Sequence, residues 1–212
     1  MRYAMVLPIL GLLAACAPIT APSRLELSGN AGGVLLVVQV ANAFKPAYQA
    51  SLLEVALTPS NFRPSVGPGP DPLAAYRHTL NSLKRDERSS TFVLLEPLPA
   101  GTYVLQDVRG QSLRFPVAAS FQLPVGGTLT VRPGRLTYLG RAEAVNRERR
   151  SDQELRAGSL FPVIDQRIAG FANGTFDLVV RDAQAEDFAS LQAQLGRVTP
   201  DQVDTTLVKV QP

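Results

Sequence analysis

Residues 91–108 read TFVLLEPLPAGTYVLQDV, and this stretch decides the fold class. Thr91–Leu95 is apolar and partly β-branched, which predicts a buried strand. Pro97–Gly101 has the composition of a turn, and Thr102–Val108 is predicted to be the returning strand of a hairpin. Its residues are expected to alternate between the two faces of a half-buried sheet, with Tyr103, Leu105 and Asp107 on one face and Val104, Gln106 and Val108 on the other.

Short apolar segments separated by turn residues recur along the rest of the chain. The further predicted strands are Val34–Val40, Leu52–Leu57, Phe115–Leu123, Thr128–Val131, Arg135–Ala142, Phe161–Ile168, Thr175–Val180 and Thr205–Val210. Short strands with regularly spaced turns are typical of an all-β sandwich. The sequence therefore predicts a mainly β protein, an antiparallel β-sandwich.

One segment near the end predicts a helix instead. Residues 182–195 (DAQAEDFASLQAQL) place apolar side chains on one face, at Ala185, Phe188, Leu191 and Leu195. Asp182 can cap the first turn, and Gly196 is suited to end the helix. We expect this single C-terminal helix to pack on the sandwich, with a partner-binding groove as the alternative use of its apolar stripe.

Two motifs resemble segments of known modules. Leu98–Tyr103 (LPAGTY) is similar to the L-P-x-G-x-Y hairpin of transthyretin-like and carboxypeptidase-regulatory-like sandwich modules. Val131–Gly134 followed by Thr137–Gly140 resembles a segment of several bacterial envelope lipoproteins that carry such a module. Together the motifs cover only about residues 91–142. The resemblance implies a transthyretin- or Ig-like sandwich that serves in binding or assembly.

The start of the chain has the pattern of an export signal. Arg2 precedes an apolar stretch that is shorter than the roughly 20 residues of a membrane-spanning helix. Leu13-Ala14-Ala15-Cys16 then resembles the lipobox of bacterial lipoproteins, which implies cleavage between Ala15 and Cys16 and a covalent lipid on Cys16. The alternative is an ordinary signal peptide with a chance cysteine. Multiple acyl chains would make such anchoring effectively permanent.

The boundaries follow from these patterns. Residues 1–15 are expected to be the signal peptide, residues 16–33 the lipidated end and a tether, and residues 34–212 a single domain. Leu25–Leu27 is a candidate first edge strand within the tether. Pro59–Pro72 carries five prolines and two glycines and is expected to be an exposed loop. Ala17 follows the cysteine, a pattern that resembles lipoproteins of the outer membrane, facing the periplasm or exposed at the surface.

Composition narrows the function classes. The net charge is only +3, and the one basic run, Arg147–Arg150, includes a glutamate and is expected to be a solvated face or turn. An exported chain has no normal access to nucleic acid, so no nucleic-acid partner is expected. A polyanion such as lipopolysaccharide remains an alternative partner. Cys16 is the only cysteine, so an internal disulfide is impossible and stability must come from the core.

No pattern points to a catalytic centre. His78 is the only histidine and lacks a nearby nucleophile motif, so we expect a structural role for it. A metal site of the usual kind needs several His or Cys ligands, and none is expected. The neighbouring acids Asp86-Glu87 and Glu186-Asp187 are candidates for glycosidase-type chemistry, but a turn and a helix start explain them as well. We therefore expect no cofactor other than the lipid on Cys16.

The leading hypothesis is a non-enzymatic, lipid-anchored cell-envelope protein that acts as an interaction or scaffold module. Its partners would be the membrane, through Cys16, and another envelope protein. The alternative is a carrier or sensor of a small apolar or glycan ligand held between the sheets. A weaker alternative is a hydrolase that uses acidic residues.

Overall fold

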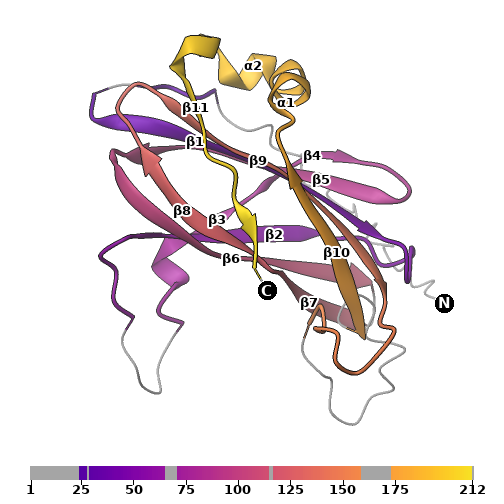
Figure 1. Cartoon of the computed structure of the whole chain (residues 1–212). Coiled ribbons are helices and arrows are strands. Elements are labelled where there is room, and N and C mark those ends of the chain that lie inside the picture. The colour runs from indigo at the N-terminus through magenta and orange to yellow at the C-terminus, as the bar shows by residue number, and fades with distance from the viewer. Residues whose placement is uncertain (1–23, 28, 65–70, 115–116, 159–172, 212) are drawn as a thin grey trace, which may run out of the picture.

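A computed structural model describes residues 24–27, 29–64, 71–114, 117–158 and 173–211. The described part is mainly β, with two sheets and few helices (Figure 1). Along the chain, groups of one to three consecutive strands belong to one sheet before the chain crosses to the other. The fold class predicted from the sequence is thus confirmed at the level of a β-rich protein with two sheets.

Sheet 1 has the order β10-β9-β1-β5-β4, with β11 also paired to β9. Its strands are β1 Ala31–Asn42, β4 Asn81–Arg85, β5 Ser89–Pro99, β9 Leu136–Glu148, β10 Gly174–Arg181 and β11 Val203–Thr205. Sheet 2 has the order β12-β8-β6-β2-β3, with β7 paired to β6. Its strands are β2 Leu52–Pro59, β3 Arg77–Thr79, β6 Gly101–Arg114, β7 Val117–Leu123, β8 Val125–Val131 and β12 Lys209–Val210.

The buried side chains of both sheets form one cluster. Leu36 of β1 and Phe92 of β5 come from sheet 1, and Leu53 of β2, Leu105 of β6 and Leu123 of β7 come from sheet 2. All five are at most 2% exposed. Alternate residues of each strand point to this core, as the period of two in a strand requires. The core therefore lies between the sheets.

A second cluster covers the outer face of sheet 1. Leu35 of β1 and Val93 of β5 point away from the first core and pack with Leu25, Leu191 and Leu195. Strand β1 is thus buried on both faces, which explains its unbroken apolar run VLLVV. A strand buried on both faces is typical of parallel pairing, and β1 indeed pairs in parallel with β9. This mixed sheet corrects the prediction of a purely antiparallel sandwich.

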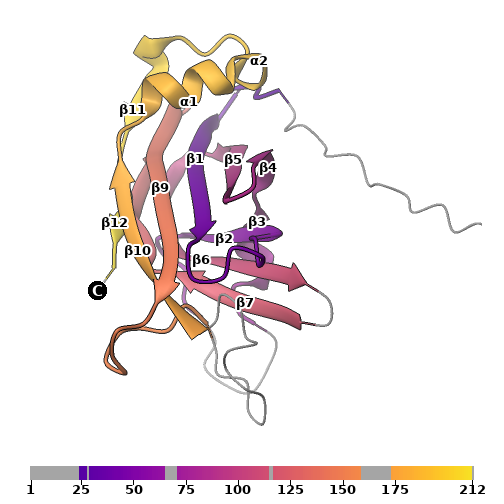
Figure 2. The ribbon, with the colours of Figure 1, turned by 90° about the vertical axis from the view of Figure 1, so that its right-hand side faces the viewer.

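The helical segment is broken into two short pieces. The sequence predicts one helix over residues 182–195, whereas the structure has α1 Gln184–Ser190 and α2 Gln192–Leu195, with Leu191 between them. Leu191 is fully buried, and its N–H donates to the carbonyls of both Asp187 and Phe188. Figure 2 shows both helices at one end of sheet 1, next to the start of β1.

The predicted hairpin at residues 91–108 is wrong. Strand β5 pairs with β1 and β4 in sheet 1, while β6 pairs with β2, β7 and β8 in sheet 2. The PLPAG turn therefore carries the chain from one sheet to the other, and the Tyr103 hydroxyl donates to the Pro99 carbonyl across it, at 2.9 Å. The turn at Pro133-Gly134 does the same between β8 and β9, with Gly134 in the left-handed region at φ 67°.

Several edges differ from the predicted strands. The edge strands β3 and β4 were not predicted, because they are short and carry polar residues. The predicted final strand over residues 205–210 is two short strands, β11 in sheet 1 and β12 in sheet 2. The β7–β8 turn is shorter than expected, since β8 begins at Val125. The strand predicted at residues 161–168 lies outside the described residues.

The described structure includes residues from within the predicted tether, 16–33. Leu25 is only 6% exposed and lies in the second cluster, and its N–H donates to the Gln194 carbonyl at 2.8 Å. Residues 24–27 contain no strand, so the edge strand considered for Leu25–Leu27 is absent there. Strand β1 begins at Ala31, before the predicted start at Val34. The packed structure therefore reaches back to Leu25.

Candidate functional site

The outer face of sheet 2 carries polar side chains instead of a helical cover. Leu53 and Val55 of β2 face the core between the sheets, so Glu54 between them faces outward. Arg109 of β6 is the neighbour of Glu54 in the register, and Gln122 of β7 is the neighbour of Arg109 on the other side. Glu54, Arg109 and Gln122 thus form one row across three strands.

Two arginines and two aspartates form a closed ion-pair network on this face. Arg77 of β3 reaches Asp71 through Nη2 at 3.0 Å and Asp107 of β6 through Nη1 at 3.1 Å. Arg109 reaches Asp107 through Nε at 2.8 Å and Asp71 through Nη1 at 3.4 Å. The side chains of Asp107 and Arg77 are 6% and 12% exposed, whereas Arg109 is 46% exposed. The network therefore has a covered side and an open side.

A β-bulge places Asp107 in this network. Ala56 of β2 pairs with Asp107, but the next residue, Leu57, pairs with Leu105, so Gln106 is the extra residue of β6. The bulge shifts the alternation by one, so that Leu105 and Val108 both face the core while Asp107 faces outward. This corrects the prediction that Leu105 and Asp107 share a face.

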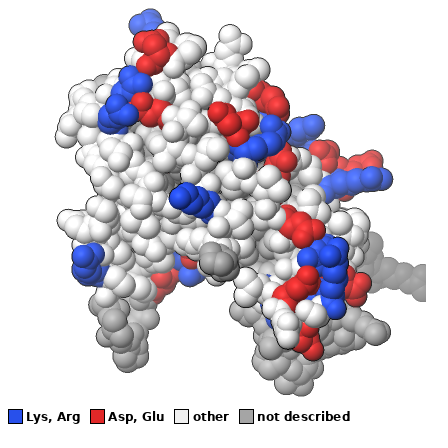
Figure 3. Space-filling view, viewed as in Figure 1, with Lys and Arg blue, Asp and Glu red and all other residues white. Residues whose placement is uncertain are grey.

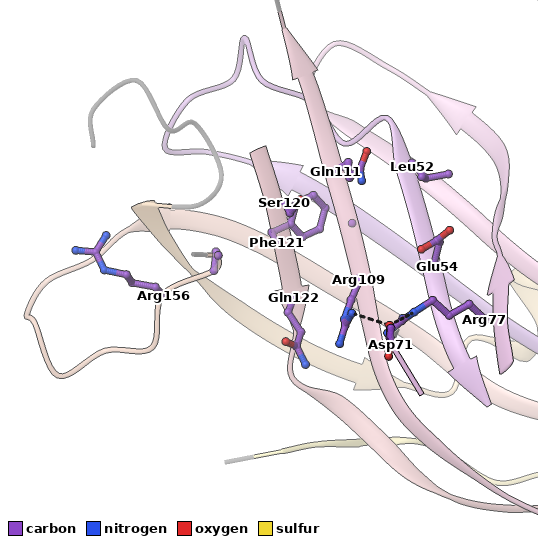
Figure 4. Close-up of a pocket in the computed structure, with 13 residues that line it drawn as sticks. Leu52, Glu54, Asp71, Arg77, Arg109, Gln111, Ser120, Phe121, Gln122 and Arg156 are labelled. Atoms are coloured by element: carbon purple, nitrogen blue, oxygen red, sulfur yellow. Dashed lines mark hydrogen bonds and ion pairs between the residues drawn. The ribbon is translucent and has the colours of Figure 1, made fainter. Parts of the chain in front are cut away.

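Asp71, Arg77 and Arg109 of the network form one wall of an open cavity of about 680 Å³, the sheet 2 cavity (Figure 4). Its other polar side chains are Glu54, Gln111, Ser120 and Gln122 from the sheet, and Arg156 on the far side. Figure 4 shows Arg109 between Gln122 and Asp71, with its guanidinium toward Asp71. Gln111, Ser120 and Gln122 are exposed. The cavity thus offers amide, hydroxyl and guanidinium groups to a polar partner.

The ion pairs and hydrogen bonds of the network shift the pKa values of Asp71 and Arg77. The backbone N–H of Leu73, followed by the hydrogen bond from Arg77, lowers the pKa of Asp71. Burial alone would lower the pKa of Arg77, but the hydrogen bonds to Asp107 and Asp71 outweigh it and raise that pKa. Asp71 is therefore an anion at neutral pH and is poorly suited to donate a proton.

His78 lies at the rim between the two sheets. Its Nδ1 is 2.6 Å from Oε2 of Glu96, which belongs to β5 of sheet 1. His78 itself is on β3 of sheet 2, so the pair links the edges of both sheets. The contact therefore connects an edge strand of sheet 2 to a strand of sheet 1, which fits a structural role for His78.

The two acidic pairs singled out in the sequence are separate and have different partners. Asp86 accepts hydrogen bonds from the N–H groups of Arg88 and Ser89 in the turn between β4 and β5, and these lower its pKa. Glu186 is exposed and pairs with Arg181. Neither acid lines the sheet 2 cavity.

Asp187 is buried beneath α1. Its side chain is 1% exposed, accepts the Tyr138 hydroxyl at 2.6 Å, and pairs with Arg141, whose Nε is 2.9 Å away. Burial, and then the bond to Asp187, raises the pKa of Tyr138. The Tyr138 oxygen also accepts the N–H of Ala183. Asp187 therefore fastens the helical segment to β9.

The basic run at residues 147–150 is neutralised locally. Arg147 pairs with Glu154 at 2.8 Å and with Asp177 of β10 at 2.9 Å. Arg149 pairs with Asp152, and the Arg150 N–H donates to Glu154. Figure 3 shows blue and red atoms side by side on this part of the surface, over β9 and β10. The run therefore spans the end of β9 and the turn that follows it, and nearby acidic side chains pair with Arg147 and Arg149.

Ala15 and Cys16 lie outside the described residues. Within the described ranges, no three His, Cys, Asp or Glu side chains gather in a way that could hold a metal ion. Among the same residues, no helix has both the length and the apolar character needed to cross a bilayer.

Sequence reasoning did not single out Asp71, Arg77, Asp107 or Arg109. Asp107 and Arg109 are two residues apart on one strand, a spacing that places both on the same face and could have marked them. Asp71 follows the proline-rich stretch and Arg77 lies on an unpredicted edge strand, so no local pattern joins them to β6.

Comparisons with known proteins add no relative. No protein-family model matches the chain, and no curated protein is similar to it. One solved structure with a detectable likeness is a leucine-rich repeat protein from Bacteroides thetaiotaomicron, with 12% identity and a TM-score of 0.31. The alignment covers 53% of this chain and 14% of that protein. A likeness this low carries no argument about fold or function.

Proposed function

We propose that this protein is a lipid-anchored cell-envelope protein, held by Cys16, that acts without catalysis by binding a polar partner at the sheet 2 cavity. The first partner to consider is another envelope protein. The anchor rests on Leu13-Ala14-Ala15-Cys16, and its place would be the outer membrane, facing the periplasm or the surface. The observation that carries the binding role is the open cavity on the outer face of sheet 2, where the described part of the chain places no covering element.

The state of the charged groups favours recognition over hydrolysis. A glycosidase needs one carboxylic acid that stays protonated near neutral pH. Asp71 is held as an anion by Leu73 and Arg77, and Asp107 contacts two guanidinium groups. The half-exposed Arg109 keeps donors that face the cavity, because only Nε and Nη1 contact the network. Such a group suits a carboxylate or other polar acceptor on a partner.

The packing favours a surface site over a carrier for apolar ligands. The side chains between the sheets, such as Leu36, Leu53 and Leu105, contact one another and are nearly unexposed. The sheet 2 cavity is lined by polar side chains from the outer face instead. A glycan would still fit this polar lining, and it is the second candidate for the bound partner.

We also infer that the two sheets form a sandwich of the transthyretin- or Ig-like kind, with the C-terminal helical segment packed on it. Its support is the shared core and the two motif turns, at residues 97–101 and 131–136, which both cross between the sheets. The parallel pair β1–β9 is a departure from that pattern.

The anchor is tested by the intact mass of the protein purified from its native envelope. A chain that begins at Cys16 and carries the mass of acyl groups is expected, and a Cys16→Ser form should lose both the lipid and the membrane fraction. An unmodified chain cleaved elsewhere would contradict the anchor.

The binding site is tested by filling the cavity. Gln122→Arg places a long cation in it, and Gln192→Arg makes the same change at an exposed position of α2. After cross-linking in the native envelope, the Gln122→Arg protein should lose the stoichiometric partner that wild type and Gln192→Arg retain. Equal recovery by all three proteins would contradict the site.

A further inference from the structure

The described residues nearest to Cys16 in the sequence lie at the helical end of the molecule. Leu25 is buried with Leu191 and Leu195, and its N–H is bonded to the carbonyl of Gln194. Figure 2 places this part of the chain beside α2, at the opposite end of the molecule from β7. The point of attachment is therefore fixed on one end of the protein.

The chain between the anchor and this point is short. Eight residues lie between Cys16 and Leu25. A fully extended chain spans at most about 3.6 Å per residue, so the nine steps from Cys16 to Leu25 reach roughly 32 Å. A compact domain of this length is about 40 Å across. The link is thus shorter than the domain is wide, so it keeps the helical end of the anchored molecule close to the bilayer.

The surface at this end has groups that suit lipid headgroups. Arg24 and Arg197 are exposed, and the two arginines border a groove of about 490 Å³ with Leu25, Leu27 and Val198. Within the described residues, neither arginine has an ion pair. By contrast, Arg132 and Arg135 both pair with Asp204. Free cations beside apolar side chains are typical of surfaces that lie at a membrane interface.

Gly196 brings the two arginines together. It adopts a φ of 64°, and a Cβ at this position would lie 2.6 Å from Nε of Arg24. The Arg24 side chain therefore lies over the backbone just before Arg197. Glu26 also borders the groove, so the surface is only weakly basic. A weakly basic surface suits the orientation of a protein that is already anchored better than the recruitment of a free one.

From these observations we propose that the surface around Arg24, α2 and Arg197 rests against the phospholipid headgroups, and that the sheet 2 cavity is turned away from the membrane. This inference rests on the proposed lipid anchor at Cys16. It adds a second contact with the membrane and explains how the cavity stays open to a partner.

The test relies on Cys16 being the only cysteine of the chain. In the lipid-modified protein the Cys16 sulfur is blocked, so a fluorophore can be attached at one added cysteine, Ala193→Cys on α2 or Ser120→Cys on β7. Both positions are exposed. The lipid-modified proteins are placed in vesicles of phosphocholine and phosphoglycerol lipids, some of which carry a headgroup quencher. Quenching should be several-fold stronger at position 193, and equal or stronger quenching at position 120 would overturn the orientation.

A charge reversal separates the arginine contact from the short link. Arg24→Glu combined with Arg197→Glu should reduce the quenching at position 193, while Arg88→Glu, at the exposed β4–β5 turn, should leave it unchanged. An unchanged signal in the double variant would overturn the role of the arginines. Sedimentation with the vesicles distinguishes the two proposals: a protein that stays in solution overturns the anchor itself, whereas a vesicle-bound protein with equal quenching overturns only the orientation.

Discussion

On sheet 1 the outer side chains of β1 and β5, such as Leu35 and Val93, are buried beneath the helical segment, whereas on sheet 2 the outer side chains Arg109 and Gln111 of β6 reach solvent. The outer cover of sheet 1 is apolar and is fastened by one buried carboxylate, Asp187. The outer face of sheet 2 holds its charges in a network that is open on one side. Sheet 1 therefore has a structural outer face, whereas the outer face of sheet 2 is polar and, among the described residues, has no helical cover.

The largest effect is expected from Asp187→Ala. This change leaves Arg141 and the Tyr138 hydroxyl without their buried partner, and breaking a buried ion pair costs about 3–5 kcal/mol. Urea unfolding should show this loss of free energy. Glu186→Ala, at the neighbouring exposed acid, should change the free energy of unfolding far less, because solvent screens its ion pairs. Similar losses for the two variants would show that the helical cover is not fastened at Asp187.

The apolar part of the same cover is tested by Leu191→Ala. Leu191 is fully buried between the helices and β9, and such truncations cost about 3 kcal/mol in unfolding free energy. The matched change Leu155→Ala removes a side chain that is 64% exposed and should change stability by no more than about 0.5 kcal/mol. A small loss for Leu191→Ala would mean that sheet 1 does not depend on its cover.

On sheet 2 the two arginines of the network should differ. Arg77→Ala removes a covered side chain that holds both Asp71 and Asp107, and it should cost about 1–3 kcal/mol. Arg109→Ala removes the half-exposed arginine and should cost about 0–1 kcal/mol while weakening partner binding. Thermal unfolding and partner recovery measured together would separate them. A larger stability loss for Arg109→Ala would reverse the assignment of covered and open sides.

The smallest effect on stability is expected from lowering the pH, through the protonation of Glu154. The hydrogen bond from Arg147, followed by that from the Arg150 N–H, lowers the pKa of Glu154 to about 2. Its contribution to stability is therefore complete above the ordinary glutamate pKa, near pH 4.5, and is lost as the pH falls toward about 2. Urea midpoints measured from pH 5 to pH 2 should fall less steeply in Glu154→Gln than in wild type. Parallel curves would contradict the pairing.

The sequence predicted most strands because their apolar residues alternate or run together between turns, as in Val34–Val40 and Thr91–Leu95. It did not predict which sheet each strand joins, since PLPAG can close a hairpin or cross between sheets with the same residues. The prediction of one continuous helix was also wrong. Local propensity would continue the helix through Leu191, but Leu191 is buried in the second cluster and the helix is interrupted there.

The candidate site was harder to predict than the fold. Its members come from a loop, an edge strand and a bulged strand, and the bulge at Gln106 reverses the period-two pattern that would have placed Asp107. The proposed lipid attachment at Cys16 rests only on the local sequence Leu13-Ala14-Ala15-Cys16, so it could be proposed without any structure.

The central claim is that partners bind sheet 2 and not the helical cover of sheet 1. It is tested most directly by a photo-cross-linking amino acid placed at Gln122 in one form of the anchored protein and at Gln192 in another. In the native envelope, the account predicts a discrete protein or glycan adduct from position 122 and none from position 192. A discrete adduct from position 192, with none from position 122, would contradict it.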